Sequence, residues 1–367
     1  MLLKKHNPDY WTFLIILVML TFGIIMVFSA SQYFAQHKPY EDSYYFLKRQ
    51  LFNALLGIVA MVILMNFDYH HFRKLCIPLL VVGLGLVAVV LAIGSEAGGA
   101  VRWIDLGFIR FQPSEIMKIA LVIFLAASLS KKDQKQLSNL KKGFLPYVLL
   151  IGAVFCLVAI ENLSTAIIMA GTAWLMMFCA GNKPAHLFTL VLIGVVGIII
   201  AIQMEGFRMG RLTAFLDPWA DPKGLGYQTI QSMVAIGSGG LTGVGLGAGG
   251  AKWYYLPDRH TDFIFSIIAE ELGLVGGIFV FLLFAAFTWR GLSIAWNSSD
   301  TFGSLLATGL TLMISLQATI NLGVALGCLP VTGVTLPFIS YGGTSLVISL
   351  AAMGVLLNVS RYANLRR

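Results

Sequence analysis

The feature that most constrains this chain is a series of long apolar runs separated by short polar segments. The first, WTFLIILVMLTFGIIMVFSA at residues 11–30, has about the 20 residues that a helix needs to cross roughly 30 Å of hydrocarbon. Of the 367 residues, 58% are hydrophobic and only 11% are charged, whereas a soluble domain carries about a quarter charged residues. The chain is therefore predicted to be a membrane protein. Residues 11–30 are its expected first anchor, because a cleaved signal would be shorter and would end in a small-x-small site.

We predict an all-α polytopic membrane protein with about ten transmembrane helices, forming a single domain over residues 1–367. The expected spans are residues 11–30, 47–66, 76–94, 112–130, 144–160, 164–181, 187–204, 263–289, 301–326 and 345–360. Most Lys and Arg residues in the short connecting segments fall on one side, so the positive-inside rule predicts that both termini are cytoplasmic. Most acidic residues fall on the other side. Any chemistry is therefore expected at the outer face.

Charge and cysteine content exclude several classes of function. The net charge is +8, but the cations are spread thinly along the chain, which favours membrane orientation over nucleic-acid binding. The four cysteines, Cys76, Cys156, Cys179 and Cys328, lie in or beside apolar runs without C-x-x-C spacing. They indicate neither a metal site nor a disulfide framework.

Two outer segments are too rich in Pro and Gly to be simple links. Residues 205–262 form a large loop between the seventh and eighth predicted helices, and its aromatic, turn-rich sequence predicts a structured extracytoplasmic cap with short helices. Residues 327–344, GCLPVTGVTLPFISYGGT, form a second, re-entrant-like outer segment. Non-helical backbone near membrane depth persists only where protein buries it or a cavity hydrates it. The two segments together predict a cavity that opens outward.

The stretch YLPDRHTDFIFSIIAEELG, residues 255–273, concentrates ionisable groups at the start of an apolar helix. Asp262 stands immediately before that helix, where a carboxylate can cap it or interact with its dipole. The same carboxylate beside a cavity can act as a general base or bind a hard divalent cation. A formal G-x-G-x-x-G match at residues 245–250 lacks the strand and helix of a nucleotide site, so loop glycines are the better interpretation.

Other charged residues fall within or beside the apolar runs. Glu115 and Lys118 are three residues apart on one helix face, which favours an internal ion pair. The adjacent Glu270 and Glu271 point to different faces, so one is expected to pair inside the bundle while the other lines a cavity. A cavity with basic groups, aromatic rings and one carboxylate fits a lipid carrying phosphate and sugar, and it equally fits an anionic solute awaiting transport.

Four long motifs, in order along the chain, resemble the SEDS family (shape, elongation, division, sporulation), and they lie nearer to its division and sporulation branch than to its elongation branch. The motifs are RWIDLGFIRFQPSEIMKIAL, RLTAFLDPWADPKGLGYQTIQSMVAIGSGGLTGVGLG, YYLPDRHTDFIFSIIAEELG and LPVTGVTLPFISYGGTSL. The resemblance implies a peptidoglycan glycosyltransferase that polymerises lipid II at the outer face of the bacterial cytoplasmic membrane during cell division. The implied partners are a class B penicillin-binding protein, which is a transpeptidase, and other divisome membrane proteins.

The resemblance also implies roles for particular residues. It assigns the essential acid to Asp262, as a catalytic base or as a metal ligand. It implies substrate binding by Arg102, Trp103, Gln112, Ser114, Glu115, Lys118, His260, Thr261, Ser340, Tyr341 and Gly342. The leaving undecaprenyl pyrophosphate arrives with the lipid, so no nucleotide is implied, whereas a divalent cation such as Mg²⁺ or Mn²⁺ is compatible with it. At residues 160–166, Glu161 and Asn162 stand where relatives usually carry Pro and Asp, so no catalytic role is assigned there.

Two other classes of function stay open at this point. A flippase would move lipid II across the bilayer without forming a glycosidic bond, and Glu115, Lys118 and the paired glutamates could line its route. The outward bias of the acidic residues argues against it, because a carrier must serve both sides. A scaffold that only recruits enzymes would leave Asp262 freely replaceable.

Overall fold

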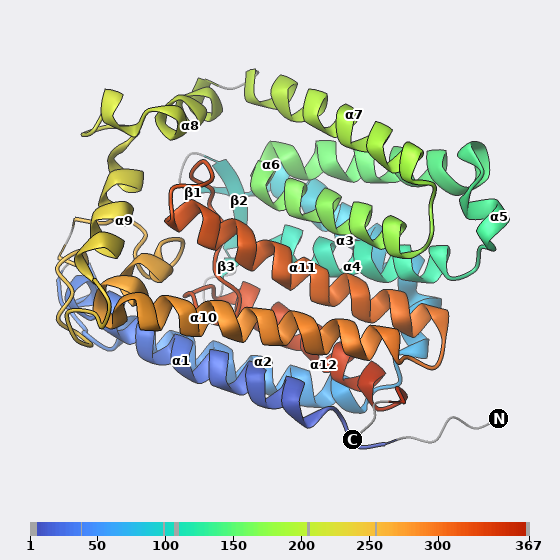
Figure 1. The fold of residues 1–367 in the computed structure, drawn as a ribbon, viewed down its shortest axis with the longest axis horizontal. Coiled ribbons are helices and arrows are strands. Elements are labelled where there is room, and N and C mark those ends of the chain that lie inside the picture. The colour runs from blue at the N-terminus through green and yellow to red at the C-terminus, as the bar shows by residue number, and fades with distance from the viewer. Residues whose placement is uncertain are drawn as a thin grey trace.

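The computed structural model describes residues 6–37, 39–97, 100–105, 110–203, 206–253 and 255–364. The elements in chain order are α1 (Tyr10–Ala35), α2 (Tyr45–Asn66), α3 (His70–Ile93), β1 (Ser95–Ala97), β2 (Ala100–Asp105), β3 (Arg110–Phe111), α4 (Pro113–Leu129), α5 (Gln134–Leu137), the π-helical turn η1 (Leu140–Phe144), α6 (Leu145–Cys179), α7 (Pro184–Gln203), α8 (Gly206–Leu216), the 3₁₀ turn η2 (Pro218–Ala220), α9 (Tyr227–Ser238), α10 (Ile264–Trp296), α11 (Thr301–Ala325) and α12 (Thr344–Ser360). The long helices run side by side along one axis (Figure 1).

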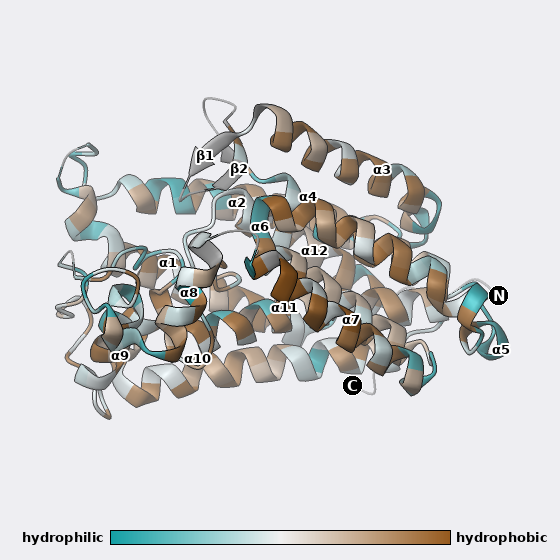
Figure 2. Ribbon diagram, turned by 90° about the horizontal axis from the view of Figure 1, so that it is seen from above, coloured by the Kyte–Doolittle hydropathy of each residue, from teal (hydrophilic) through white to brown (hydrophobic). Residues whose placement is uncertain are grey.

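The long helices have the length and composition of membrane spans. Among the described residues, six helices are long and apolar enough to cross a bilayer, and shorter apolar helices lie at Pro184–Ile200 and Thr344–Ser360. Hydrophobic residues run along the helix bodies, and polar residues concentrate at the two ends of the bundle (Figure 2). Of the six spans, α11 is the most buried, and it lies in the middle of the bundle. The polytopic membrane class is therefore confirmed, whereas the count of ten spans stays a prediction.

Helix α6 accounts for two of the predicted spans. Its backbone leaves helical geometry at Asn162, where φ is −153° and ψ is 96°, so two helices meet at a sharp kink. Asn182, just past the end of α6, donates hydrogen bonds to the carbonyls of Leu137 and Gly143, just before its start, at 3.2 and 3.0 Å. The two ends of α6 therefore lie together, and its halves form a hairpin as the predicted pair of spans requires.

The prediction of an all-α fold is wrong in one place. Between α3 and α4 the chain forms three short antiparallel strands in the order β1-β2-β3. Trp103 pairs with Ser95, and Ile104 pairs with Phe111. The helix-spanning pattern stops here, and β-branched and aromatic residues such as those of AVRWID favour extended backbone.

The two Pro- and Gly-rich segments differ in structure. Residues 206–253 contain the short helices α8 and α9 and the turn η2, so the short helices expected in the large loop are present. Residues 328–343 are largely non-helical but mostly buried or half-buried. Both segments lie at the end of the bundle that also holds the strands, which we call the cavity end (Figure 1).

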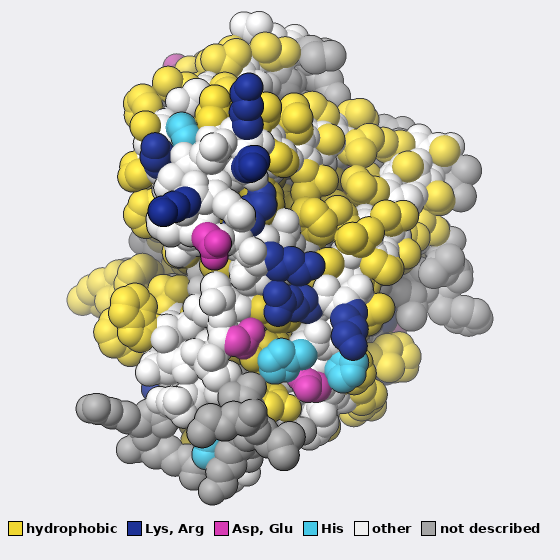
Figure 3. Space-filling view, turned by 90° about the vertical axis from the view of Figure 1, so that its right-hand side faces the viewer, with side chains coloured by type: hydrophobic (Ala, Val, Ile, Leu, Met, Phe, Trp, Pro, Cys, Tyr) yellow, Lys and Arg dark blue, Asp and Glu magenta, His cyan; other side chains and the backbone are white. Residues whose placement is uncertain are grey.

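The opposite end, which we call the basic end, holds residues 6–9, 66–71, 131–143, 181–184, 297–300 and 358–364. The backbone N–H of His6 donates to the carbonyl of Arg361 at 2.8 Å, so both ends of the described chain meet here. Lys and Arg side chains gather on this face (Figure 3). They include the exposed Arg73, Lys74, Lys131, Lys135, Lys141, Lys142 and Lys183.

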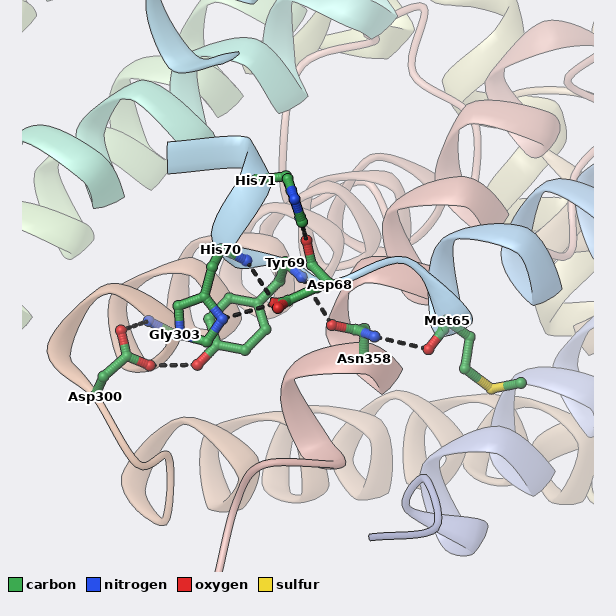
Figure 4. A network of polar contacts seen from close by, with 8 residues as sticks. All are labelled: Met65, Asp68, Tyr69, His70, His71, Asp300, Gly303 and Asn358. Carbon is green, nitrogen blue, oxygen red and sulfur yellow. Dashed lines mark hydrogen bonds and ion pairs between the residues drawn. The ribbon is translucent and has the colours of Figure 1, made fainter. Parts of the chain in front are cut away.

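Polar groups at the basic end bind one another. The amide of Asn358 accepts a hydrogen bond from Tyr69 N at 2.9 Å and donates to Met65 O at 2.8 Å. The hydroxyl of Tyr69 donates to Asp300 Oδ1, and the other oxygen of Asp300 accepts from Gly303 N at 3.3 Å (Figure 4). These bonds tie α2, α3, α11 and α12 together. Those to Met65 O, Tyr69 N and Gly303 N also satisfy backbone groups at helix ends that would otherwise lack partners.

Candidate active site

A cavity of about 610 Å³ lies at the cavity end, and nearly every major element there contributes to its wall. Its lining includes Arg49 and Asn53 from α2, Trp103 from β2 and Arg211 from α8. The segment before α10, the non-helical residues 333–343, and helices α4, α6, α11 and α12 complete the wall. A cavity of this size is typical of small-molecule and cofactor sites.

Most residues predicted to form the site meet in this cavity. The predicted residues that line it are Trp103, Gln112, Glu115, Lys118, Thr261, Asp262, Tyr341 and Gly342. They come from β2, the start of α4, the segment before α10 and the segment before α12, which are far apart in the sequence. The side chain of Arg102 lies outside the described residues.

Three of the predicted substrate-binding residues lie behind the wall rather than on it. Ser114 is fully buried and donates to Glu161 Oε1 at 3.0 Å. Ser340 accepts from Leu336 N at 2.8 Å and donates to the carbonyl of Thr261 at 2.5 Å. These bonds occupy both hydroxyls in supporting the wall.

His260, the third of these residues, is held by aromatic rings. Its ring lies 4.5 Å from the Phe46 ring and 5.7 Å from the Tyr341 ring, measured between centroids. Burial, together with the nearby charge of Arg259, lowers the pKa of His260 to about 4. The imidazole is therefore neutral at physiological pH, and it packs rather than carrying charge.

The position of Asp262 excludes one of its alternative roles, that of a helix cap. Helix α10 begins at Ile264, its N-cap is Phe263, and no side chain forms a capping hydrogen bond there. The backbone N–H groups of Thr261, Asp262 and Phe263 all point to the carbonyl of Asp258, at 3.0 to 3.2 Å. Asp262 lies in this turn with its side chain on the cavity wall. It is therefore not the helix cap.

The turn that carries Asp262 is fixed from behind. Asn321 on α11 is buried and donates from Nδ2 to the carbonyls of Asp262 and Val334, both at 2.7 Å. The backbone N–H of Tyr341 donates to the carbonyl of His260 at 2.9 Å. The Asp262 turn, the segment before α12 and the central helix α11 are thus joined into one wall, and such fixed positioning is what a catalytic group requires.

Glu115 and Lys118 form the ion pair that their spacing predicts. Lys118 Nζ lies 3.0 Å from Glu115 Oε1 and 2.8 Å from Gln317 Oε1. The other oxygen of Glu115 accepts from Ser345 Oγ at 3.0 Å. Both charged residues are buried yet line the cavity, so a charged pair with defined geometry faces the space where a ligand would lie.

Several cavity residues were missed by the sequence reasoning. Arg49 is exposed on the wall, lies 4.7 Å over the Tyr45 ring, and pairs with no carboxylate among the described residues. Its neighbour on the same helix face is Asn53, four residues on. Gln317 is likewise a polar residue within an apolar span. Polar residues spaced by one helical turn within an apolar span indicate a helix face that lines a polar cavity, and this pattern could have predicted these residues.

The departure from the family pattern at residues 160–166 has a structural counterpart. Asn162 lies at the kink of α6, lines the cavity, and accepts from Thr165 N at 3.2 Å, as an N-cap does for the second half of the helix. Glu161 is buried behind the wall, where it accepts from Ser114. The pair shapes the cavity, and no role in chemistry is assigned to it.

Fold and cavity together define a polytopic membrane protein with a polar, charged cavity at one end of its bundle. The chain matches the sequence profile of the cell cycle protein family of FtsW, RodA and SpoVE over residues 10–365, and it belongs to that family.

Relatives and solved structures agree with this assignment. Stage V sporulation protein E of Bacillus subtilis (strain 168) is 45% identical over 363 residues, covering 98% of this chain and 99% of that protein. A probable peptidoglycan glycosyltransferase FtsW of Geobacter sp. (strain M18) is 41% identical over 360 residues, covering 97% and 98%.

Two solved structures share the fold. One comes from work on the structural coordination of polymerization and crosslinking by a peptidoglycan synthase complex. It is 30% identical with a TM-score of 0.81, covering 97% of this chain and 98% of that one. The rod shape determining protein RodA of Thermus thermophilus is 28% identical with a TM-score of 0.72, covering 98% of both chains.

Proposed function

We propose that this chain polymerises lipid II into glycan strands during cell division and releases undecaprenyl pyrophosphate. Membership of the family, with relatives named as peptidoglycan glycosyltransferases, makes the chain a cell wall glycosyltransferase. The observation that carries the finer proposal is the cavity. It gathers the Asp262 carboxylate, the cations Arg49, Lys118 and Arg211, and several aromatic rings in one space.

In the reaction, the 4-hydroxyl of the acceptor sugar attacks the anomeric carbon of the lipid-linked donor. The new C–O bond forms as the bond from the anomeric carbon to the pyrophosphate breaks, and the anomeric configuration inverts. Asp262 accepts the hydroxyl proton, which makes the oxygen a better nucleophile. A base in this position typically contributes about 10²–10⁴-fold to the rate.

The leaving pyrophosphate needs positive charge around it. Arg49 supplies this charge from α2, because a guanidinium binds phosphate oxygens through two parallel donors. Arg211 lies on the wall contributed by α8, where Nη1 donates to the carbonyl of Val331 at 3.3 Å. Lys118, whose charge is shared with Glu115, faces the same space.

A divalent cation in the cavity would be held by carboxylates together with the substrate. Among the described residues no group of three His, Cys, Asp or Glu side chains could hold a metal ion. Mg²⁺ and Mn²⁺ are commonly bound by one or two carboxylates together with substrate phosphates. Asp262 and Asp258, which both line the cavity, would supply the carboxylates, and the ion would add positive charge beside the pyrophosphate.

Charge and one solved relative support the proposed orientation and partner. With the basic end in the cytoplasm, as the positive-inside rule requires, both termini are cytoplasmic and the cavity opens at the outer face of the cytoplasmic membrane. The solved relative from a complex that couples polymerization to crosslinking supports a class B penicillin-binding protein as partner. Other divisome membrane proteins would join the pair at the division site.

The direct test is a polymerisation assay with labelled lipid II in proteoliposomes, using the purified chain with and without a co-purified transpeptidase and divalent cations. Glycan chains that a muramidase digests are the expected product. Empty liposomes provide the control. Transbilayer movement of the labelled lipid without a new glycosidic bond would instead identify a flippase and overturn the proposal.

A further inference from the structure

A buried charged cluster lies outside the cavity. Glu271 on α10 is 0% exposed, accepts from Ser29 Oγ on α1 at 2.8 and 2.6 Å, and pairs with Lys252 Nζ at 2.9 Å. Lys252 is buried as well and also donates to the carbonyl of Gly247. The cluster therefore joins α1, α10 and the segment between α9 and α10. Neither Glu271 nor Lys252 lines the cavity, so the proposed chemistry does not use them.

The neighbouring glutamate binds the same segment through its backbone. Glu270 is 5% exposed, and Oε1 accepts from the N–H groups of Gly250 and Ala251 at 2.7 and 3.1 Å. Neither Glu270 nor Glu271 lines the cavity, so the expectation that one of the two would do so is wrong for this cavity. Adjacent positions do point to different faces, but both faces meet residues 243–252.

Helix α10 is broken at the point where this segment attaches. Gly273 has φ of 65° and ψ of −160°, which interrupts the helical hydrogen bonds. Val244 N and Gly245 N donate to the carbonyls of Glu270 and Glu271 at 3.0 and 3.1 Å. Leu274 N and Val275 N, past the break, donate to the carbonyls of Gly240 and Leu241 at 2.9 and 3.2 Å.

The contact is so close that only glycine fits at Gly243, where φ is 82° and a Cβ would lie 2.1 Å from the Glu271 carbonyl. Residues 240–252, which we call the docked segment, thus supply partners for backbone groups that the break would leave unpaired. The glycines of the formal G-x-G-x-x-G match, Gly245, Gly247 and Gly250, lie in this docked segment and are exposed, as the interpretation of loop glycines expects.

The docked segment leads directly into the Asp262 turn. Nine residues lie between Lys252 and Asp262, and the first turns of α10 connect Asp262 to Glu270 and Glu271 from the other side. We infer, on the basis of the proposed function, that Lys252 and Glu271 are positioning residues for the glycosyl transfer. Their ion pair holds the docked segment against α10 and so sets where the turn places the Asp262 carboxylate.

The test uses four variants of the full chain: Lys252→Met, Glu271→Gln, the double variant, and Ser29→Ala. Removing one partner leaves a buried charge unpaired and is expected to destabilise the whole protein, whereas removing both leaves no orphan charge. The double variant is therefore expected to fold while it lacks the pair. Ser29→Ala keeps both charges and weakens the hold on Glu271. Lys223→Met is the matched control, because Lys223 is an exposed lysine of the same outer region.

Hydrogen exchange and steady-state kinetics are measured on each folded variant. In the double variant we expect the amides of Val244, Gly245, Gly250 and Ala251 to exchange about tenfold faster or more, since their docking is weakened. The amides of the Asp262 turn should follow with a smaller increase. The kcat for lipid II should fall by roughly tenfold to a hundredfold, as expected for a misplaced catalytic group, with KM changed by about twofold or less. Ser29→Ala should increase the exchange rates of the same amides by a smaller factor, and Lys223→Met should leave these rates unchanged.

Faster exchange in the docked segment without any change in the Asp262 turn would overturn the inference, and so would unchanged kcat in a folded double variant. If Ser29→Ala and the double variant both exchange like the unchanged protein, the inference also fails. A chain that forms no glycan under any condition would refute the proposed function. Exchange in the Asp262 turn would then still decide for or against the positioning effect.

Discussion

The two ends of this bundle carry the same kinds of residue and use them differently. At the basic end, aspartates stand beside helix starts and bind them: Asp9 accepts from Thr12 N at 2.9 Å, and Asp300 accepts from Gly303 N at 3.3 Å. Asp9 also accepts from Arg290 and from the Thr12 hydroxyl, and Asp300 also accepts from Tyr69. At the cavity end, Asp262 stands two residues before α10, yet no side chain caps that helix, and the carboxylate lines the cavity.

Three carboxylates thus stand near the start of a membrane helix but have different functions. Their position along the sequence does not determine which function each one has. At the basic end, neighbouring helix ends lie close enough for polar side chains to bond groups on other helices, as the Asn358 network shows (Figure 4). At the cavity end, residues from the strands, from the two Pro- and Gly-rich segments and from several helices surround a cavity instead. The space between them is where polar groups can act on a ligand.

The largest effect on stability is expected where the cavity wall itself contains a buried pair. Lys118→Met leaves Glu115 buried without its ion-pair partner and should lower the free energy of unfolding by about 3–5 kcal/mol. Adding Glu115→Gln should recover most of that loss, because no orphan charge remains. Equilibrium unfolding in mixed micelles measures both. Equal stability of the single and double variants would show that the pair does not act as a unit.

An intermediate effect, on catalysis rather than on stability, is expected when Arg49 on the cavity wall is replaced. Arg49→Met removes a proposed phosphate ligand that pairs with no carboxylate among the described residues. The kcat/KM for lipid II should fall by about 10–100-fold, the value of a charge-assisted hydrogen bond of roughly 1.5–3 kcal/mol. The unfolding midpoint should not change. A stability loss with normal kcat/KM would place Arg49 with the structural residues.

A substitution at the basic end is expected to have a smaller effect, and to change stability without changing catalysis. Tyr69→Phe removes the hydroxyl that donates to Asp300, and its net contribution to stability is expected to be about 1 kcal/mol. The polymerisation rate at saturating substrate should match that of the unchanged chain, because the network lies at the opposite end from the cavity. A rate change larger than the stability change would reveal coupling between the two ends.

The smallest effect is expected at an exposed pair beside the cavity end. Lys48 lies 2.8 Å from Asp42, with side chains 69% and 37% exposed. Exposed pairs of this kind contribute little to stability. Lys48→Ala should therefore leave the unfolding midpoint unchanged within error. A clear shift would mean that this segment is packed more tightly than its exposure indicates.

Much of the fold could be predicted from the sequence, because a helix that crosses a bilayer must have a certain length and an apolar composition. The predicted spans fall within a few residues of the helices at most boundaries, and even the hairpin of α6 was anticipated as two spans. The strands between α3 and α4 were missed because they are short and depend on pairing across a turn, which leaves no periodic pattern in the sequence.

The site was predicted less completely, for a physical reason. Asp262, Trp103 and Glu115 lie in motifs that mark them, and they do line the cavity. Arg49 and Gln317 carry no such mark, because which face of a helix lines a cavity depends on how the helices pack. His260 lies in the same motif as Asp262 but is buried among aromatic rings. The two residues lie in one backbone turn, which directs Asp262 to the cavity and His260 to the packing behind the wall.

The catalytic role of the Asp262 carboxylate is tested most directly by comparing Asp262→Asn with Asp42→Asn in the lipid II polymerisation assay. Both changes replace a carboxylate oxygen with an amide, but only Asp262 lines the cavity. We expect Asp262→Asn to lower kcat by roughly 10²–10⁴-fold with an unchanged unfolding midpoint, and Asp42→Asn to retain normal activity. Glycan chains of normal length, formed at the normal rate by a folded Asp262→Asn protein, would show that Asp262 is not the catalytic base.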